Sequence, residues 1–154
     1  MNKQEKPRTI IVGVGNLLLK DEGIGIHAAR ALQEAGLSPE VEIIDGGTSP
    51  DFVSYVRKDD TLVIIDAVKA GGEPGEVYRF TPEDVEAQSH EALSLHELGV
   101  MNSLRMMRLG GSQPRKVVII GVEPEEIAPG LELTSCLAKV LPRIVELARQ
   151  ECPG

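Results

Sequence analysis

The chain has 154 residues, of which 42% are hydrophobic and 26% charged, a balance that excludes a disordered or fibrous protein. Its formal net charge of −8 disfavours a nucleic acid partner, because a phosphate backbone would be repelled from most of the surface. No apolar run reaches the roughly 18 residues of a membrane span, and Cys136 and Cys152 form no C-x-x-C pair. We therefore expect one cytoplasmic domain over residues 1–154, flexible at 1–8, without a membrane partner.

The chain begins with the pattern of a buried strand and a helix. Thr9–Val14 is rich in β-branched residues and is followed by Gly15-Asn16, which predicts a strand covered on both faces and then a turn. Apolar residues recur at helical spacing between residues 23 and 35, and Gly36 predicts the end of that helix. The first unit is therefore a strand, a loop and a helix.

Two further strands are predicted, each followed by an aspartate. Val41–Ile44 leads into Asp45-Gly46-Gly47-Thr48, and Pro50–Val56 is a short candidate helix with proline in its first turn. Leu62–Ile65 is the third strand and is followed by Asp66. Strands that alternate with helices predict right-handed crossovers and a mostly parallel sheet covered on both faces.

The next segment predicts an edge strand and a longer helix. Residues 71–75 are rich in glycine and form a loop, and residues 76–80 alternate between apolar and polar, as in a strand with one wet face. We take it as an edge strand that could run antiparallel. Ser94–Leu109 predicts a helix whose start has the S-x-x-E form of a capping box.

The C-terminal part supplies the last strand and helix. Lys116–Ile120 is the fifth strand, and an amphipathic helix begins at Thr134. Pro142 should kink or divide that helix. The fold class is therefore α/β: a single three-layer domain with a mostly parallel five-stranded sheet between helices and one edge strand that could be antiparallel.

Acidic residues follow several of these strands. In an open parallel sheet, ligands bind beyond the carboxyl ends of the strands. A single aspartate there is more often a turn former or a helix cap, but repetition at successive strand ends weakens that interpretation. Crowded carboxylates repel one another unless a cation lies between them, so a divalent metal is the simplest explanation. The polar residues at this rim are Asn16, Asp21, Glu22, Asp45, Asp66 and Glu123.

His96 is the histidine best placed to join a metal site. It lies in the first turn of its predicted helix, where the helix dipole disfavours an imidazolium, so the ring should be neutral at pH 7. Neutral imidazole combined with carboxylates suits nickel or zinc better than calcium. A structural role for His96 stays open, His27 is interpreted as structural or as a support to the ligands, and His90 receives no role.

Other catalytic motifs are missing from the sequence. Gly13-x-Gly15 lacks the third glycine of a dinucleotide fingerprint, where this chain has Leu18. It has no phosphate-binding P-loop, no H-E-x-x-H and no G-x-S-x-G, and Cys136 lies on an apolar helical stripe. A nucleotide-binding flavodoxin-like module is thus supported only by the alternation of strands and helices.

Residues 13–25 form the string G-x-G-N-x-L-x-x-D-[DE]-G-x-G, and further short motifs follow it at residues 45–48, 65–67, 94–99 and 121–124. In content and order these motifs resemble the hydrogenase maturation endopeptidase family, from about Thr9 to about Arg149. The resemblance implies a five-stranded sheet between helices and a cleft whose metal ligands are two acids and one histidine. At the matching positions of this chain these ligands are Glu22, Asp66 and His96.

The resemblance also implies an activity. Members of the family remove a C-terminal extension from the precursor of the nickel-iron hydrogenase large subunit after nickel insertion. The nickel is carried by the substrate, and the same ligands would accept other divalent metals. We expect a monomer that binds the precursor through Asn16, Gly23, Gly25 and Asp45.

The hydrolytic mechanism is left open by the sequence. It shows no nucleophile, so we favour metal-assisted hydrolysis over an aspartyl type, with Asp45 as the candidate for a catalytic group. The leading alternative is a non-catalytic nickel-sensing chaperone of the large subunit, which would need the same three ligands.

Overall fold

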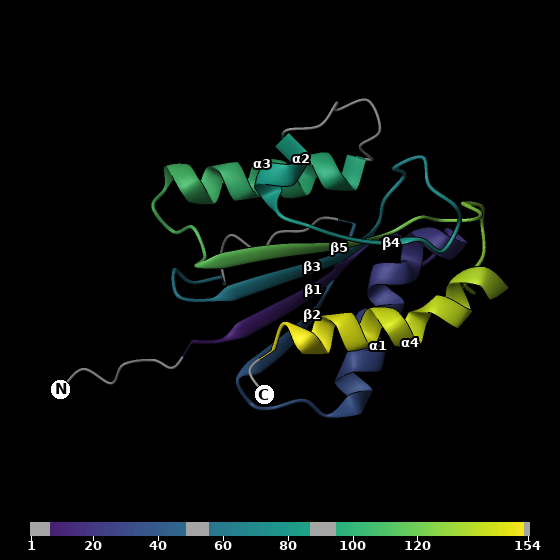
Figure 1. Ribbon diagram of the computed structural model, residues 1–154, viewed down its shortest axis with the longest axis horizontal. Coiled ribbons are helices and arrows are strands. Elements are labelled where there is room, and N and C mark those ends of the chain that lie inside the picture. The colour runs from purple at the N-terminus through teal and green to yellow at the C-terminus, as the bar shows by residue number, and fades with distance from the viewer. Residues whose placement is uncertain (1–6, 49–55, 87–94, 153–154) are drawn as a thin grey trace.

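The computed structural model describes residues 7–48, 56–86 and 95–152, with the side chains of 85, 86 and 95–99 left out. The described chain alternates strands and helices around one sheet (Figure 1). In chain order the elements are β1 (Thr9–Val14), the 3-10 helix η1 (Lys20–Gly23), α1 (Ile24–Ala35), β2 (Val41–Gly47), β3 (Thr61–Ala67), β4 (Val77–Phe80), α2 (Pro82–Glu86), α3 (Leu95–Leu109), β5 (Lys116–Val122) and α4 (Ser135–Gln150).

The five strands form one sheet in the order β2-β1-β3-β5-β4. All neighbouring strands pair in parallel except β4, which runs antiparallel to β5 with Val77 opposite Val122. Every residue of β1 and β3 is buried, as their continuous apolar runs predict for strands covered on both faces. The predicted α/β class, the parallel sheet and the antiparallel edge strand are confirmed.

Helices cover both faces of the sheet, and each face has its own hydrophobic core. Figure 1 shows α2 and α3 on one face and α1 and α4 on the other. Successive residues of a strand point to opposite faces, so Ile10 packs with the α3 residues Leu104 and Met107, whereas Ile11 packs with Leu32 of α1. The layers therefore follow directly from the apolar pattern of the strands and helices.

Several element boundaries differ from the prediction. β2 extends through Gly47, and β3 extends through Asp66 to Ala67, so residues predicted to follow these strands belong to them. The short elements η1 and α2 were not predicted. α4 is one continuous helix that includes Pro142, so the proline does not divide it.

Some predictions fall largely outside the described residues. These are the helix at 50–56, of which only the last residue is described, and the cap at Ser94. The predicted flexible segment 1–8 is described only from Pro7, and Arg8 forms ion pairs with Asp60 and Glu42. None of the described helices combines the length and apolar character needed to cross a bilayer.

Two glycines bring the start of α1 close to the sheet. A Cβ built on Gly13 of β1 would lie 2.1 Å from the carbonyl oxygen of Gly25. A Cβ built on Gly25 would lie 2.2 Å from the carbonyl oxygen of Ile65 in β3. The first turn of α1 therefore lies directly against the carboxyl end of β3, so close that only glycine fits at these two positions.

Candidate active site

Two elements that carry predicted metal ligands lie at the carboxyl end of the sheet, and a third runs toward it. Glu22 lies in η1, which contacts β3, and Asp66 lies near the end of β3. The far end of α3, with Leu104 and Arg108, lines a small cavity together with Lys116 at the start of β5. Since α3 ends near the amino end of β5, its first turn, which contains His96, lies toward the carboxyl ends.

Asp66 is held in a buried position inside the sheet. Its residue is 2% exposed, and its Oδ1 accepts a hydrogen bond from the backbone N–H of Ala67 at 2.8 Å. In register it pairs with Gly121 of β5, one residue beyond the last β3 residue that pairs with β1. A buried carboxylate at the end of a central strand is in the place where parallel sheets bind ligands.

Glu22 is half-buried, and its backbone is fixed by the loop that leaves β1. Its carbonyl accepts a hydrogen bond from Asn16 N at 3.1 Å, and its N–H donates to Leu19 O at 3.1 Å. Gly15 has a φ of 151°, and a Cβ there would lie 2.0 Å from the Glu22 carbonyl oxygen. The glycine-rich string therefore folds the chain tightly enough to place Glu22 beside the sheet.

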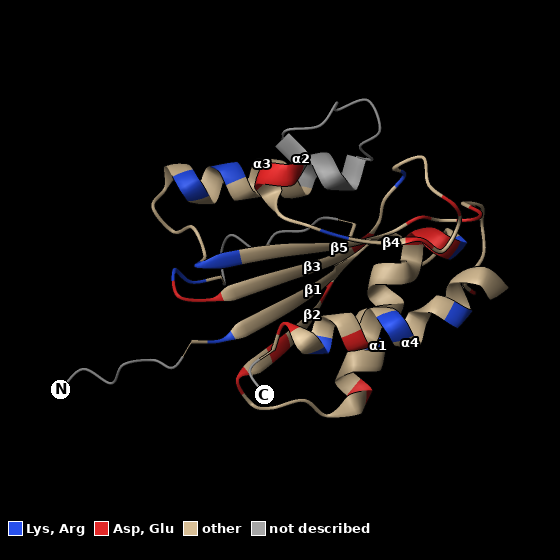
Figure 2. Ribbon diagram, in the orientation of Figure 1, with Lys and Arg blue, Asp and Glu red and all other residues tan. Residues whose placement is uncertain are grey.

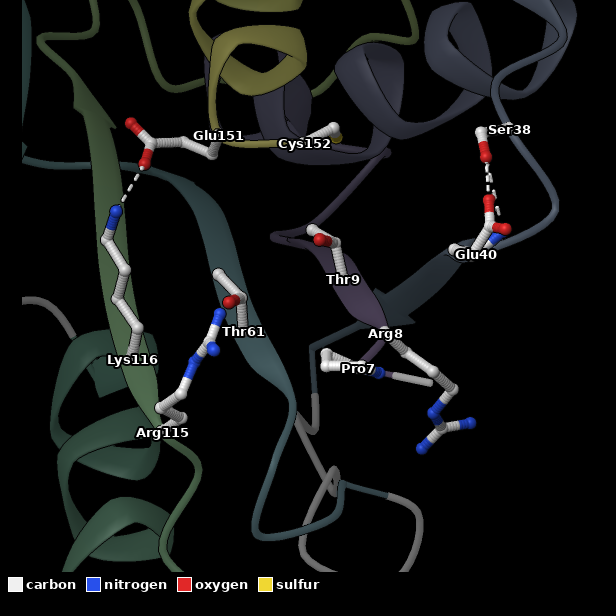
Figure 3. Close-up of a pocket in the computed structure, with 10 residues that line it drawn as sticks. All are labelled: Pro7, Arg8, Thr9, Ser38, Glu40, Thr61, Arg115, Lys116, Glu151 and Cys152. Atoms are coloured by element: carbon white, nitrogen blue, oxygen red, sulfur yellow. Dashed lines mark hydrogen bonds and ion pairs between the residues drawn. The ribbon is translucent and has the colours of Figure 1, made fainter. Parts of the chain in front are cut away.

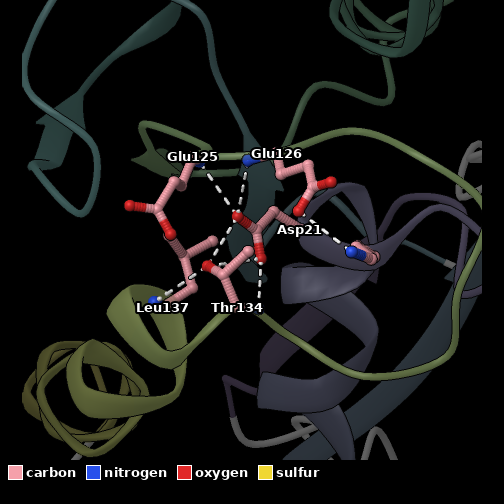
Figure 4. A network of polar contacts seen from close by, with 6 residues as sticks. Asp21, Glu125, Glu126, Thr134 and Leu137 are labelled. Atoms are coloured by element: carbon pink, nitrogen blue, oxygen red, sulfur yellow. Dashed lines mark hydrogen bonds and ion pairs between the residues drawn. The ribbon is translucent and has the colours of Figure 1, made fainter.

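Asp21, next to Glu22, is fully buried and accepts hydrogen bonds from three backbone amides (Figure 4). The Glu125 and Glu126 amides donate to its Oδ2 at 2.9 and 3.0 Å, and the Thr134 amide donates to its Oδ1 at 2.9 Å. The Thr134 hydroxyl also donates to the carboxylate and accepts from Leu137 N as the cap of α4. Asp21 thus joins the turn of Glu22 to the start of the last helix.

Glu123, the residue after β5, anchors the loop that follows β3 in a similar way. It is 7% exposed, and its Oε1 accepts hydrogen bonds from Ala70 N and Gly72 N at 3.0 Å and from the Tyr78 hydroxyl at 2.9 Å. Burial, followed by the hydrogen bond to Glu123, raises the pKa of Tyr78, which therefore remains a neutral donor. Glu123 shapes the loop that follows β3.

These contacts revise the sequence interpretation of the acidic rim. Asp21 and Glu123 were grouped with Glu22, Asp45 and Asp66 as acids gathered around a cation. The structure instead shows both as hydrogen-bond acceptors for backbone amides of distant segments. Sequence alone showed the carboxylates but not the amides that point at them.

Among the predicted substrate-binding residues, Asp45 and Asn16 both form local turns. The Asp45 carboxylate accepts a hydrogen bond from Gly47 N at 3.0 Å and lies 3.9 Å from Arg30 Nη2, with 42% of its side chain exposed. Asn16 Oδ1 accepts from Leu18 N at 2.9 Å. Both residues lie at the carboxyl-end rim, and their contact with a substrate stays a prediction.

The glycines predicted to admit a peptide are partly explained by internal packing. Gly25 is buried, and the space beside its Cα is filled by the carbonyl oxygens of Ile65 and Val14. This accounts for Gly25 without a substrate. A Cβ on Gly23 would lie 3.1 Å from Leu17 Cα and 3.5 Å from the ring of His27, so Gly23 also borders the chain's own atoms.

The histidines are only partly described. The side chain of His96 and the whole of His90 lie outside the described residues. Within the described part, no three histidine, cysteine or acidic side chains group as metal ligands, so the set of Glu22, Asp66 and His96 stays a prediction. Burial lowers the pKa of His27, and the nearby charge of Arg30 lowers it further, against the effect of a hydrogen bond to the Leu131 backbone.

A cavity of about 580 Å³ lies at the opposite, amino end of the strands (Figure 3). Thr9 and Thr61 at the starts of β1 and β3 line it, together with Glu151 and Lys116, which form an ion pair at 3.3 Å. In Figure 2 basic residues are prominent at the starts of the strands and acidic residues in the loops at the other end. Lys116 and Glu151 thus pair with each other at this cavity, and the predicted ligands Glu22 and Asp66 lie elsewhere.

Comparison with known proteins identifies the family of this chain. The hydrogenase maturation protease family model matches residues 26–151. Hydrogenase 2 maturation protease of Escherichia coli K12 is 34% identical over 142 residues, covering 90% of this chain and 87% of that relative. HupD, a hydrogenase expression/formation protein of Thiocapsa roseopersicina, is 38% identical over 124 residues, covering 79% of this chain and 56% of the relative.

Solved structures show the same fold. The hydrogenase maturating endopeptidase HybD from E. coli has a TM-score of 0.84 at 32% identity, covering 94% of this chain and 91% of that chain. HybD from Thermococcus kodakarensis has a TM-score of 0.79 at 28% identity, covering 95% and 99%. The chain belongs to the hydrogenase maturation protease family, whose members are peptide-bond hydrolases.

Proposed function

We propose that this chain removes the C-terminal extension of a nickel-iron hydrogenase large-subunit precursor after nickel has been inserted. The observation that carries the proposal is the 34% identity to the hydrogenase 2 maturation protease of E. coli over 90% of this chain. The contact between η1, which carries Glu22, and β3, which carries Asp66, adds support.

In this proposal Glu22, Asp66 and His96 bind the nickel that the precursor carries. The donor set fits the metal, because two carboxylates and a neutral imidazole are ligands that nickel accepts. Burial of Asp66 keeps water away from one side of the site, and the rigid turn of η1 orients Glu22. Nickel held jointly by both proteins would polarise the scissile carbonyl or activate a water molecule.

A non-catalytic nickel-sensing chaperone is the competing function. It would use the same ligands but would leave the precursor at its full length. Family membership favours the enzyme, because the similar solved structures are named as an endopeptidase and a maturation protease. The mass of the precursor after incubation distinguishes the two functions.

The test compares nickel-loaded and nickel-free precursor, each incubated with wild type and with His96→Ala. We expect wild type to release a C-terminal peptide from the nickel-loaded form only, and His96→Ala to be slower by about two orders of magnitude or more. Intact mass spectrometry over time measures both effects. His90→Ala is the matched control, because no role is assigned to that histidine.

Two results would contradict the proposal. Equal cleavage of nickel-free and nickel-loaded precursor would reject recognition through the metal. Normal processing by His96→Ala would remove that residue from the ligand set while leaving the protease activity itself intact.

A further inference from the structure

Exposed apolar side chains gather beside the turn that carries Glu22. Among the described residues, five large hydrophobic side chains are more than a third exposed, and three of them lie on two neighbouring segments. Leu18 is 63% exposed, Leu131 62% and Ile127 37%. Single exposed apolar side chains are normal on a protein surface, whereas several on adjacent segments indicate a binding surface.

The two segments are joined by backbone hydrogen bonds. Gly130 N donates to Leu18 O and Lys20 N donates to Gly130 O, both at 2.9 Å, and Leu19 and Gly130 form a parallel bridge. Leu18 N also donates to Asn16 Oδ1 at 2.9 Å. The backbone of Leu18 is therefore held on both sides while its side chain points away from the core.

Leu131 is held from a different direction. Its neighbour Gly130 is bonded to Leu18 and Lys20, and its segment is tied to the Asp21 network through Glu126 and Thr134. Leu18 thus lies three residues before the buried Asp21, and Leu131 lies three residues before Thr134, which donates to that carboxylate. A rigid apolar surface binds a partner with a small loss of conformational entropy.

The charge around this surface is negative. No lysine or arginine occurs between residues 117 and 138, and this stretch contains four glutamates. Glu125 and Glu132 are exposed, and Glu126 pairs with Lys20 at 2.9 Å. The surface therefore complements a segment that combines an apolar side chain with basic neighbours.

We propose that Leu18 and Leu131, flanked by Ile127, form the contact surface for the C-terminal segment of the precursor. This inference rests on the proposed function and names the part of the substrate that is recognised: an extended peptide with an apolar anchor and basic flanking residues. The surface begins four residues before Glu22, so a peptide bound there passes beside the predicted metal ligands.

The two remaining exposed hydrophobic residues provide a matched control. Met106 and Leu109 of α3 are 64% and 88% exposed, but they lie on the opposite face of the sheet among arginines. The test compares Leu18→Ser/Leu131→Ser with Met106→Ser/Leu109→Ser. Each pair removes two exposed apolar side chains, so a general effect on solubility or folding would appear in both.

Nickel-loaded precursor is the probe, and its KM and kcat are measured by the rate of peptide release. We expect Leu18→Ser/Leu131→Ser to raise KM about tenfold with kcat little changed, because only substrate binding is lost. The α3 pair should match wild type. Equal KM values for the two double variants, or a loss confined to kcat, would overturn the inference.

Charge reversal tests the basic part of the peptide. Glu125→Lys/Glu132→Lys is compared with Glu34→Lys/Glu146→Lys, which makes the same change in net charge on exposed positions of α1 and α4. KM should rise for the first pair alone, and the rise should shrink at high salt. Equal behaviour of the two pairs would overturn the predicted basic flanks.

The failure of this inference is distinguishable from failure of the proposed function. If wild type neither binds nor trims the nickel-loaded precursor, the proposed function is wrong. If wild type trims it and the leucine variant does so with an unchanged KM, the function stands and the contact surface is wrong.

Discussion

Asp21 and Glu22 are adjacent carboxylates with opposite surroundings. Asp21 is fully buried among amide donors, whereas Glu22 is half-buried at the rim of the sheet. A carboxylate with three backbone amides is a strong acceptor and has little capacity left for a metal. Glu22, in the more open position, is therefore the better candidate for a metal ligand. Asp21 holds the turn in place, and Glu22 is left to bind.

Replacing Asp21 by alanine should destabilise the protein strongly. The three amides and the Thr134 hydroxyl would lose a charged acceptor, so we expect the free energy of unfolding to fall by about 2–4 kcal/mol. Urea denaturation followed by circular dichroism measures the change. Glu126→Ala is the control, since its exposed ion pair with Lys20 contributes about 1 kcal/mol or less. Equal midpoints for the two variants would contradict the anchoring role.

At the scale of elements, the contact between α1 and the sheet depends on glycine. Gly25→Ala would place a Cβ 2.2 Å from Ile65 O and 2.4 Å from Val14 O, both of which are backbone atoms that cannot rotate away. We expect a loss of about 2–3 kcal/mol, despite the better helix propensity of alanine. Thermal or urea unfolding measures it.

Gly110→Ala is the matched control for this substitution. The nearest atom to a Cβ at Gly110 is Met106 O at 3.4 Å, an ordinary contact, so the stability should change by less than about 1 kcal/mol. Similar effects at both glycines would show that the close approach of α1 to β3 is not what constrains position 25.

Glu151 links α4 to the edge of the sheet. It caps the end of α4, and its carboxylate accepts two hydrogen bonds from Arg79 of β4 at 2.8 and 3.1 Å and pairs with Lys116 of β5 at 3.3 Å. The hydrogen bond from Arg79 is the largest cause of the lowered pKa of Glu151. The charged carboxylate therefore stabilises the folded state.

Glu151→Gln should lower stability in a pH-dependent way. Because the folded pKa is lowered, the contribution of the carboxylate is present above its ordinary pKa of 4.5 and is lost as the pH falls through the folded pKa. We expect a deficit of about 1 kcal/mol near pH 7, limited by the half-exposed Arg79, and a smaller deficit near pH 3.5. Urea unfolding at both pH values measures it, and a constant deficit would contradict the ionic origin.

The elements with long, regular patterns could be predicted from sequence. β1 and α1 match their predicted bounds, because β-branched runs and helical periodicity extend over whole elements there. η1 and α2 have four and five residues, which is too short for a period to appear. β2 continues through Asp45-Gly46-Gly47 because pairing with β1 overrides the turn preference of those residues.

For the whole molecule, topology explains which parts of the site were predictable. The carboxyl ends of parallel strands meet at one edge, so the contact between η1, which carries Glu22, and β3, which carries Asp66, agrees with the sequence interpretation. The roles of Asp21 and Glu123 depend on partners 104–113 and 45–53 residues away. Hydrogen-bond partners so far apart in the sequence cannot be predicted from the local pattern of a single sequence.

The bond between Asp21 and Thr134 also bears on synthesis of the chain. Asp21 leaves the ribosome early, whereas the amides and hydroxyl that complete its shell belong to residues 125–134. Until that stretch has emerged, the turn next to Glu22 lacks its support from α4. A nascent polypeptide that has not yet exposed residues 125–134 would therefore be inactive, and competence would be acquired only after that stretch has left the ribosome.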